Sequence, residues 1–160
     1  MPLSHRPATE QDIARLCTFP QNPDELFFFF PKAHDPLTAE QLRAAMAQRS
    51  DSTVVERDSE VLGFANFYRW ENDGRCSIGN VIVAPSARGQ GVARYLIEQM
   101  IGIARARHKA REIGISCFNQ NVAGLLLYPS LGFEPYAIEE RQAPQGQRVA
   151  LIHMRLALEA

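Results

Sequence analysis

The chain has 160 residues, the usual size of a single domain, so we expect one domain over residues 1–160. With 46% hydrophobic and 22% charged residues, the composition is that of an ordinary globular protein and excludes a disordered or fibrous chain. The 17 Lys and Arg residues and the 18 Asp and Glu residues nearly cancel. A chain with so little net charge has no overall positive field, and we expect no nucleic-acid partner.

The cysteines, histidines and apolar runs point to a simple intracellular protein. Cys17, Cys76 and Cys117 are too widely spaced for a disulfide framework or a zinc-binding CxxC pair. The four histidines show no HxxxH or HxH ligand spacing. No apolar run is long enough to span a bilayer, and the first residues lack the apolar stretch of a signal peptide. We therefore expect a cytoplasmic protein with no membrane partner and no metal.

The first third of the chain predicts a strand followed by two helices. Residues 3–9 indicate a short strand, and Thr9 with Asp12 is typical of a capping box that opens a helix reaching Cys17. Four prolines then interrupt the chain and leave room only for a short turn or helix around residues 24–29. Next, Thr38 is expected to cap a helix over residues 39–49.

The remaining elements predict a mixed α+β fold. Residues 52–83 contain β-branched and aromatic runs separated by turn dipeptides, which indicates an antiparallel meander of three strands. Beyond the meander the pattern alternates helices and strands, and the strand over residues 112–118 should lie parallel to the last meander strand. The predicted elements are helices over 90–107 and 121–130 and strands over 112–118, 133–140 and 147–156. In total we expect a largely antiparallel sheet of about seven strands with about four helices.

The segment over residues 81–93 carries a pattern for binding phosphate. Gly89 and Gly91 let the main chain approach a ligand, the start of the next helix leaves N–H groups unpaired, and Arg88 adds a cation with several donors. Neither a GxGxxG nor a GxxxxGK[ST] pattern is present, which disfavours a dinucleotide or ATP site. The loop therefore predicts a pyrophosphate site of another kind.

Two motifs resemble those of one family. Arg88-x-x-Gly91-x-Ala93 resembles the [Q/R]-x-x-G-x-[G/A] acyl-CoA signature of the GCN5-related N-acetyltransferases (GNAT). Residues 121–133 resemble the family's N-x-x-A-x-x-L-Y-x-x-x-G-F pattern, with Gly124 in place of the usual Ala, a change expected only to weaken the helix slightly. The order of the predicted elements also agrees with the family over the whole chain.

The resemblance implies a fold and a donor. The two central parallel strands should splay apart, so that the pantetheine arm of acetyl-CoA fits between them. The resemblance further implies that acetyl-CoA is bound by the last meander strand, the loop, the long helix and the start of the next helix. The residues at these positions are Val81, Val83, Arg88, Gly89, Gln90, Gly91, Val92, Ala93 and Asn121.

The reaction implied by the resemblance is direct attack of a neutral amine on the acetyl thioester in a ternary complex. Tyr128 matches the family's general acid, and a phenol near the sulfur could give a proton to the leaving thiolate. The alternative is that Tyr128 only anchors its helix on the sheet. Backbone N–H groups at a bulge around Ile82 and Val83 are the expected donors to the oxyanion.

The group that deprotonates the amine is left open by the sequence. Many family members use a Glu in the strand before the phosphate loop, but residues 75–83 contain neither Asp nor Glu. The favoured hypothesis is a water held by Asn80, Ser116 or Asn119, which makes Ser116 the second catalytic candidate beside Tyr128; the alternative is a carboxylate from elsewhere. Cys117 follows the apolar alternation of its strand and is expected to be an inert buried thiol, so a covalent acyl-cysteine is disfavoured.

The acceptor pocket is expected in the connection over residues 24–32 and in the last hairpin over residues 136–148, where the family varies. Consecutive phenylalanines cannot all face the core, so at least one should line a groove; these are Phe27, Phe28, Phe29 and Phe30. Asp24 or Glu25 beside them would suit an ammonium, and Arg141 or Arg148 a substrate carboxylate. Asn80 and Asn119 are further candidates for contact with the substrate.

Several functions stay open at this stage. The favoured hypothesis is an acetyl-CoA-dependent N-acetyltransferase acting on a lysine-type amine of an amino acid or peptide, with an aminoglycoside or polyamine as the alternative acceptor. A second hypothesis is an acyl-CoA sensor without turnover. A third is an interaction domain, or a homodimer, formed through an exposed phenylalanine patch.

Overall fold

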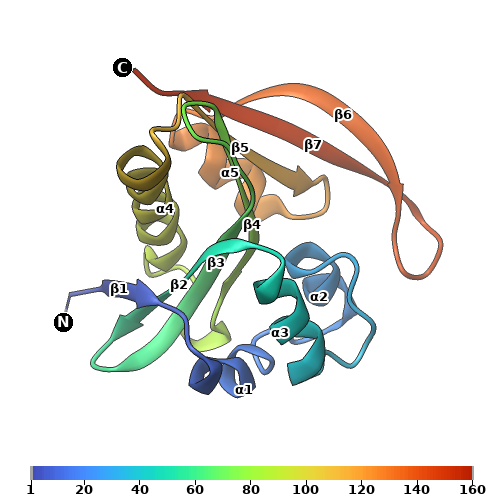
Figure 1. Ribbon diagram of the computed structural model, residues 1–160. Helices are drawn as coiled ribbons and strands as arrows, with labels where there is room; N and C mark the ends of the chain where they lie inside the picture. Colours follow the sequence, from blue (N-terminus) through green and yellow to red (C-terminus); the bar gives the residue numbers. More distant parts are fainter. Residues whose placement is uncertain (1, 160) are drawn as a thin grey trace.

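The computed structural model describes residues 2–159. Over this range, seven strands form one mixed sheet in the order β1-β2-β3-β4-β5-β7-β6, as Figure 1 shows. Strands β4 and β5 pair in parallel, and the other neighbours pair antiparallel. The strands are β1 (Ser4–Pro7), β2 (Ser50–Arg57), β3 (Glu60–Trp70), β4 (Arg75–Val83), β5 (Glu112–Phe118), β6 (Glu134–Gln142) and β7 (Arg148–Ala157).

Five α-helices accompany the sheet in the described residues, one more than the sequence predicted. They are α1 (Ile13–Leu16), α2 (Pro23–Phe29), α3 (Ala39–Ala47), α4 (Val92–His108) and α5 (Val122–Ser130). The additional helix is α2, which forms between prolines because Pro23 suits a first helical position and the Asn22 side chain accepts a hydrogen bond from the Glu25 N–H at 2.9 Å. Short 3₁₀ turns precede α1 (Glu10–Asp12) and follow β4 (Pro85–Ala87).

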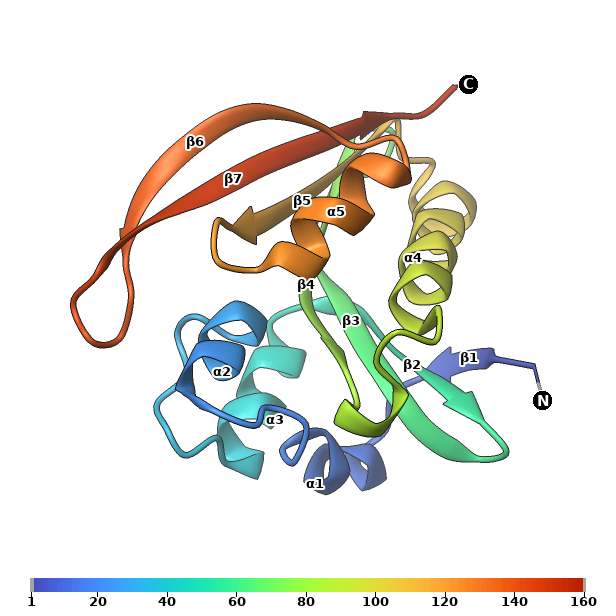
Figure 2. The same cartoon turned by 180° about the vertical axis from the view of Figure 1, so that it is seen from behind.

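The helices cover both faces of the sheet. Neighbouring residues of a strand point to opposite faces, and on β3 a Cβ at Gly63 would touch Val92 of α4, whereas the Phe64 ring contacts Phe29 of α2. Helices α2 and α4 therefore lie on opposite faces, as Figures 1 and 2 show. The main core between these layers contains long side chains with no exposure, among them Leu42, Phe67, Leu96, Ile97 and Met100. Each such side chain contributes roughly 1.5–3 kcal/mol by leaving water.

The central parallel strands separate halfway along their length. Their pairing runs from Arg75 with Glu112 to Ile78 with Ile115 and then ends. This is the splayed pair that the family resemblance implied. Just beyond that point β4 is bulged, because the register with β3 skips a residue between Gly79 and Ile82. The bulge lies before the expected position at residues 82–83, and Asn80 within it adopts a φ of +49°, a left-handed conformation that Asn tolerates.

The C-terminal hairpin extends the sheet beyond β5. Strand β7 lies between β5 and β6, so the last strand of the chain pairs with β5 and the exposed β6 forms the edge. A second apolar cluster joins this hairpin to α2, with Phe27 of α2 stacked on Phe118 of β5 at 4.3 Å between ring centroids. Ser116 and Phe118 share one face of β5, while Cys117 faces α5. The two faces of β5 therefore look onto different helices.

Candidate functional site

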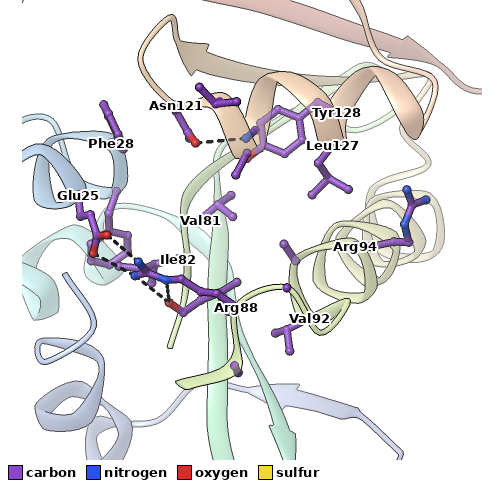
Figure 3. A pocket seen from close by; sticks show the side chains of 18 of the residues that line it. Glu25, Phe28, Val81, Ile82, Arg88, Val92, Arg94, Asn121, Leu127 and Tyr128 are labelled. Carbon is purple, nitrogen blue, oxygen red and sulfur yellow. Dashed lines mark hydrogen bonds and ion pairs between the residues drawn. The ribbon is translucent and has the colours of Figure 1, made fainter. Parts of the chain in front are cut away.

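A cavity of about 560 Å³ opens where β4 and β5 separate. Its walls come from α2, the end of β4, the loop and first turn of α4, and α5, which Figure 3 shows around the opening. Nine of the residues predicted to bind the donor or to act as acid line it: Val81, Val83, Arg88, Gly89, Gly91, Val92, Ala93, Asn121 and Tyr128. The fold thus brings the two sequence motifs together around one space.

The loop before α4 fits a diphosphate. Gly89 and Gly91 have φ values of +75° and +83°, and a Cβ added to either would meet no atom within 4 Å, so both face open space. Gly91 is the N-cap of α4, and the first helical backbone bond joins the Tyr95 N–H to the Gly91 carbonyl. The N–H groups that precede this bond are available at the positive end of the helix dipole. An anion with several oxygens could accept hydrogen bonds from these N–H groups.

The Arg88 side chain has a partner that the sequence did not predict. Its guanidinium forms a two-pronged ion pair with Glu25 of α2, with N–O distances of 2.6 and 3.0 Å. Arg88 also holds the pKa of the Glu25 carboxyl below its usual range by this hydrogen bonding. Arg88 therefore bridges the loop to α2 across the cavity, as Figure 3 shows, and its donors are not simply free for a phosphate. The Gln90 side chain bonds to Arg57 and to the Ser86 carbonyl and does not line the cavity.

Tyr128 lies at the α5 side of the cavity and is 5% exposed. Burial raises the pKa of its phenol, so the phenol keeps its proton at neutral pH. Burial also raises the pKa of the neighbouring Cys117 thiol to about 12, which leaves it a poor nucleophile. The chemistry available here is proton donation by the phenol rather than covalent catalysis by the thiol.

Gly124 has a packing role that the sequence comparison underestimated. A Cβ at this position would come within 2.7 Å of the Cys117 Sγ and 3.1 Å of the Tyr128 ring. The sulfur occupies the space that the family's usual alanine methyl group would need. One turn earlier, the Asn121 Oδ1 accepts the Gly124 N–H at 3.2 Å and caps α5, so only its amide N–H₂ group is left to contact a ligand.

The four phenylalanines of residues 27–30 do not form one wall. Phe28 and Phe29 line the cavity, although Phe29 is only 1% exposed. Phe27 is buried in the second apolar cluster, and Phe30 packs against the main core. The chain therefore has no exposed phenylalanine patch in this segment, which removes the physical basis for an interaction domain or homodimer built on one.

Three polar candidates are engaged away from the cavity. Asn80 is buried, donates to the Phe29 carbonyl at 2.9 Å and accepts from the Asn66 side chain at 3.0 Å. Asn119 ties the end of β5 to β7 through two hydrogen bonds. Its backbone N–H donates to the Ala150 carbonyl, and its side-chain Oδ1 accepts from the Ala150 N–H. Arg141 pairs with Glu139 on β6. These side chains hold the fold together and do not line the main cavity.

Ser116 faces the other side of β5 and does not line the cavity either. Its Oγ lies 2.7 Å from Nδ1 of His153 on β7, and Nε2 of His153 lies 3.1 Å from a carboxylate oxygen of Glu139 on β6. No sequence signal indicated this chain of three residues, because it depends on which residues of β5, β6 and β7 stand side by side. Register pairs Ser116 with His153 and places Glu139 one strand further out.

Arg49 is a second group that the sequence analysis missed. It follows α3, lies over the Tyr68 ring and packs against Gly79 of β4. The one side-chain hydrogen bond of Arg49 in the described part of the chain goes to a neutral partner, the Asn66 Oδ1 at 3.2 Å, and burial lowers the pKa of its guanidinium. Arg49, which packs against β4, and Ser116, which belongs to β5, lie on the same face of the sheet. A cation without a carboxylate partner is costly to bury, which suits a site for a ligand carboxylate.

Metal-ligand clusters and membrane-spanning helices are both absent from the described residues. No group of three or more His, Cys, Asp or Glu side chains in residues 2–159 is arranged to hold a metal ion. Within the same range, no helix has the length and apolarity needed to cross a membrane.

Solved structures of similar fold include three acetyltransferases. A ribosomal-protein-alanine N-acetyltransferase from Brucella melitensis has a TM-score of 0.77 at 23% identity, covering 97% of this chain and 99% of that chain. A putative acetyltransferase from Salmonella typhimurium with its cofactor acetyl-CoA has a TM-score of 0.75 at 22% identity, covering 100% and 96%. A spermidine N-acetyltransferase from Vibrio cholerae in complex with CoA and spermine has a TM-score of 0.79 at 17% identity, covering 97% and 95%.

The family model described as "Acetyltransferase (GNAT) family" matches residues 15–133, which include the phosphate loop, both separated strands and α5. The match spans most of the chain and agrees with the two motifs and the sheet topology. The chain therefore belongs to the acetyltransferase (GNAT) family and is an acetyl-CoA-dependent N-acyltransferase.

Proposed function

We propose that this enzyme transfers the acetyl group of acetyl-CoA to the primary amine of an amino acid or peptide, with a lysine-type amine as the best candidate. Transfer takes place by direct attack in a ternary complex. The observation that carries the choice of acceptor is Arg49, a partly buried cation on the acceptor side with no carboxylate partner in residues 2–159.

The donor side supports binding of acetyl-CoA, which supplies the acetyl thioester. The first turn of α4 and the open space at Gly89 and Gly91 would hold the pyrophosphate, while Val81 and Val83 offer strand backbone to the pantetheine arm. Tyr128 holds its phenolic proton at the other wall, where it would protonate the leaving sulfur. Cys117 takes no covalent part, because its thiol stays protonated.

The acceptor side favours a zwitterionic amine over a polyamine. A polyamine carries several positive charges and would be repelled by Arg49, whereas the carboxylate of an amino acid or peptide could pair with it. The fold by itself does not select the acceptor, since similar structures include both a ribosomal-protein-alanine and a spermidine N-acetyltransferase. An aminoglycoside or polyamine acceptor is thus the alternative, and a sensor without turnover is disfavoured by the intact Tyr128.

The test is thiol release from acetyl-CoA with matched acceptors that differ in their carboxylate. Lysine, lysine-ended peptides, their carboxamide forms, polyamines and aminoglycosides form the panel. We expect turnover with the carboxylates, and Arg49→Gln should raise KM for them roughly tenfold while leaving the carboxamide forms unchanged. Arg43→Gln is the matched control, because Arg43 belongs to α3 but pairs with Glu10 away from the site.

Two results would contradict the proposal. Preference of the wild-type enzyme for polyamines or aminoglycosides would replace the acceptor class. Binding of acetyl-CoA by calorimetry without turnover of any amine would favour the sensor.

A further inference from the structure

The chain formed by Ser116, His153 and Glu139 begins at the point where β4 and β5 separate. The last pairing of β4 with β5 is Ile78 with Ile115, so Ser116 is the first residue of β5 beyond the point of separation. On the opposite face of the same strand, the next residue, Cys117, packs beside Tyr128. Ser116 and Tyr128 thus flank the opening from opposite faces. From these two positions an acid could reach the sulfur and a proton acceptor could reach the amine at the same opening.

The hydrogen bonds determine which nitrogen of His153 can accept a proton. Hydrogen bonding from Arg141 and then from His153 holds the pKa of the Glu139 carboxyl below its usual range, so Glu139 is a carboxylate and can only accept. His153 must therefore donate its Nε2 proton to Glu139. Nδ1 is then the free acceptor, and it faces the Ser116 hydroxyl at 2.7 Å. A carboxylate behind an imidazole also stabilises the imidazolium once it forms.

The surroundings of His153 are mixed in charge. From β6 it faces Glu139, which Arg141 pairs with, and the Tyr136 ring at 6.2 Å between centroids. Arg155, on the same strand as His153, lies over the Tyr136 ring, and Arg75 of β4 donates to the Tyr136 hydroxyl at 2.6 Å. From β5 it meets the neutral Ser116. Within residues 2–159, Glu139 is the one carboxylate that bonds to His153.

We infer that His153, acting through the Ser116 hydroxyl, takes the proton from the acceptor ammonium and that Glu139 positions it for this step. This inference rests on the proposed function, because it requires an amine that arrives protonated. Residues 75–83 contain neither Asp nor Glu, and His153 on the last strand of the chain would supply the missing base.

The protons and bonds of the step balance. The ammonium gives a proton to the Ser116 oxygen while the Ser116 hydroxyl gives its own to Nδ1 of His153. The neutral nitrogen then forms the new C–N bond to the acetyl carbon, the C–S bond breaks, and the nitrogen loses a second proton. Tyr128 gives its phenolic proton to the sulfur, and the second proton from the nitrogen passes through solvent to the Tyr128 oxygen, which restores the phenol. The first proton leaves His153 for solvent.

The experiment compares kcat/KM against pH for the wild type, His153→Gln, Ser116→Ala, Ser116→Thr and Glu139→Gln. We expect His153→Gln and Ser116→Ala to lose roughly 100-fold at pH 7 and Glu139→Gln to lose less. Ser116→Thr keeps the hydroxyl and should retain most activity. Glu140→Gln is the matched control, since Glu140 is the next residue of β6 and pairs with Arg148 in solvent.

Two readouts separate proton transfer from a structural role. The loss in His153→Gln should shrink as the pH approaches the acceptor's own pKa, because free amine then becomes abundant without a base. The loss should also be nearly absent with an alkoxyamine or hydrazide acceptor that is already neutral at pH 7. Calorimetry with acetyl-CoA, together with circular dichroism, shows whether each variant is folded. If His153→Gln is not folded, His153→Asn replaces it.

The outcomes distinguish this inference from the proposed function. Wild-type turnover with an unchanged pH profile in folded His153→Gln overturns the relay and leaves the proposed function standing. An equal loss with charged and neutral acceptors likewise overturns the relay, because it points to a structural role. Silence of the wild type with every amine overturns both.

Discussion

The donor side and the acceptor side of this enzyme are built in different ways. The donor side comes from two continuous segments, the loop leading into α4 and the helix α5, and each segment carries its own motif. The proposed acceptor side joins single residues from distant parts of the chain, with Arg49 after α3, Ser116 on β5 and His153 on β7. A site made from continuous segments leaves a pattern in the sequence, while a site made from strand register leaves none.

The two sides also differ in how their charges are satisfied. On the donor side Arg88 is paired with Glu25, and an incoming phosphate competes with a carboxylate for it. On the proposed acceptor side, the one side-chain hydrogen bond of Arg49 within residues 2–159 goes to the neutral Asn66. The donor would therefore meet preformed backbone amides, and the proposed acceptor would meet a cation that has no carboxylate partner in the described residues.

The strongest test of the donor side is Gly91→Asp. A carboxylate at the N-cap of α4 would face the pyrophosphate, and we expect acetyl-CoA affinity measured by calorimetry to fall roughly 100-fold or more. Gly91→Asn is the matched control, because it has the same shape and tolerates the same φ of +83° but carries no charge. Equal losses in the two variants would assign the effect to backbone strain, and retained affinity in both would remove the loop from the donor site.

The next test changes chemistry without changing binding. Tyr128→Phe should lower kcat roughly 100-fold, since the buried phenol can no longer protonate the sulfur, while calorimetry should show unchanged acetyl-CoA affinity. Tyr95→Phe serves as control, because its hydroxyl bonds to His5 outside the cavity. Full activity of Tyr128→Phe would reduce Tyr128 to an anchor for α5.

The smallest expected effect concerns the packing between the two motifs. Gly124→Ala should lower the free energy of unfolding by about 1–2 kcal/mol, because the added methyl group meets the Cys117 sulfur at 2.7 Å and this outweighs the better helix propensity of Ala. In a Cys117→Ala background the same change should cost nothing. Denaturant unfolding of the four proteins measures this coupling, and additive effects would contradict it.

The sequence predicted the fold and the use of acetyl-CoA as donor, for identifiable reasons. The cap at Thr38, the alternation in the meander and the apolar stripe of α4 are local signals, and so are Gly89 and Gly91. The motif also contains Tyr128, which lines the cavity, and its role as general acid stays a prediction. The helix α2 was only half predicted, because the surrounding prolines masked its start.

The acceptor side could not be predicted to the same degree. Four consecutive phenylalanines look alike in sequence, yet tertiary packing sends Phe27 and Phe29 into separate apolar clusters. Asn80 and Asn119 are plausible water ligands by type, but bulge and strand geometry engage both elsewhere. Likewise, the proximity of His153 to Ser116 depends on β7 lying between β5 and β6, which no local pattern encodes.

The helix α2 touches both sides of the enzyme within three residues. Glu25 holds the phosphate loop through Arg88, and Phe27 stacks on Phe118 beside the last hairpin. A donor that draws Arg88 away from Glu25 would release one attachment of α2. It would thereby change the environment of the other attachment, which is the stack of Phe27 on Phe118. Linkage then requires reciprocity: the factor by which bound donor changes the affinity for the acceptor equals the factor by which bound acceptor changes the affinity for the donor. A helix of seven residues would be enough to couple the affinity for the donor to the affinity for the acceptor.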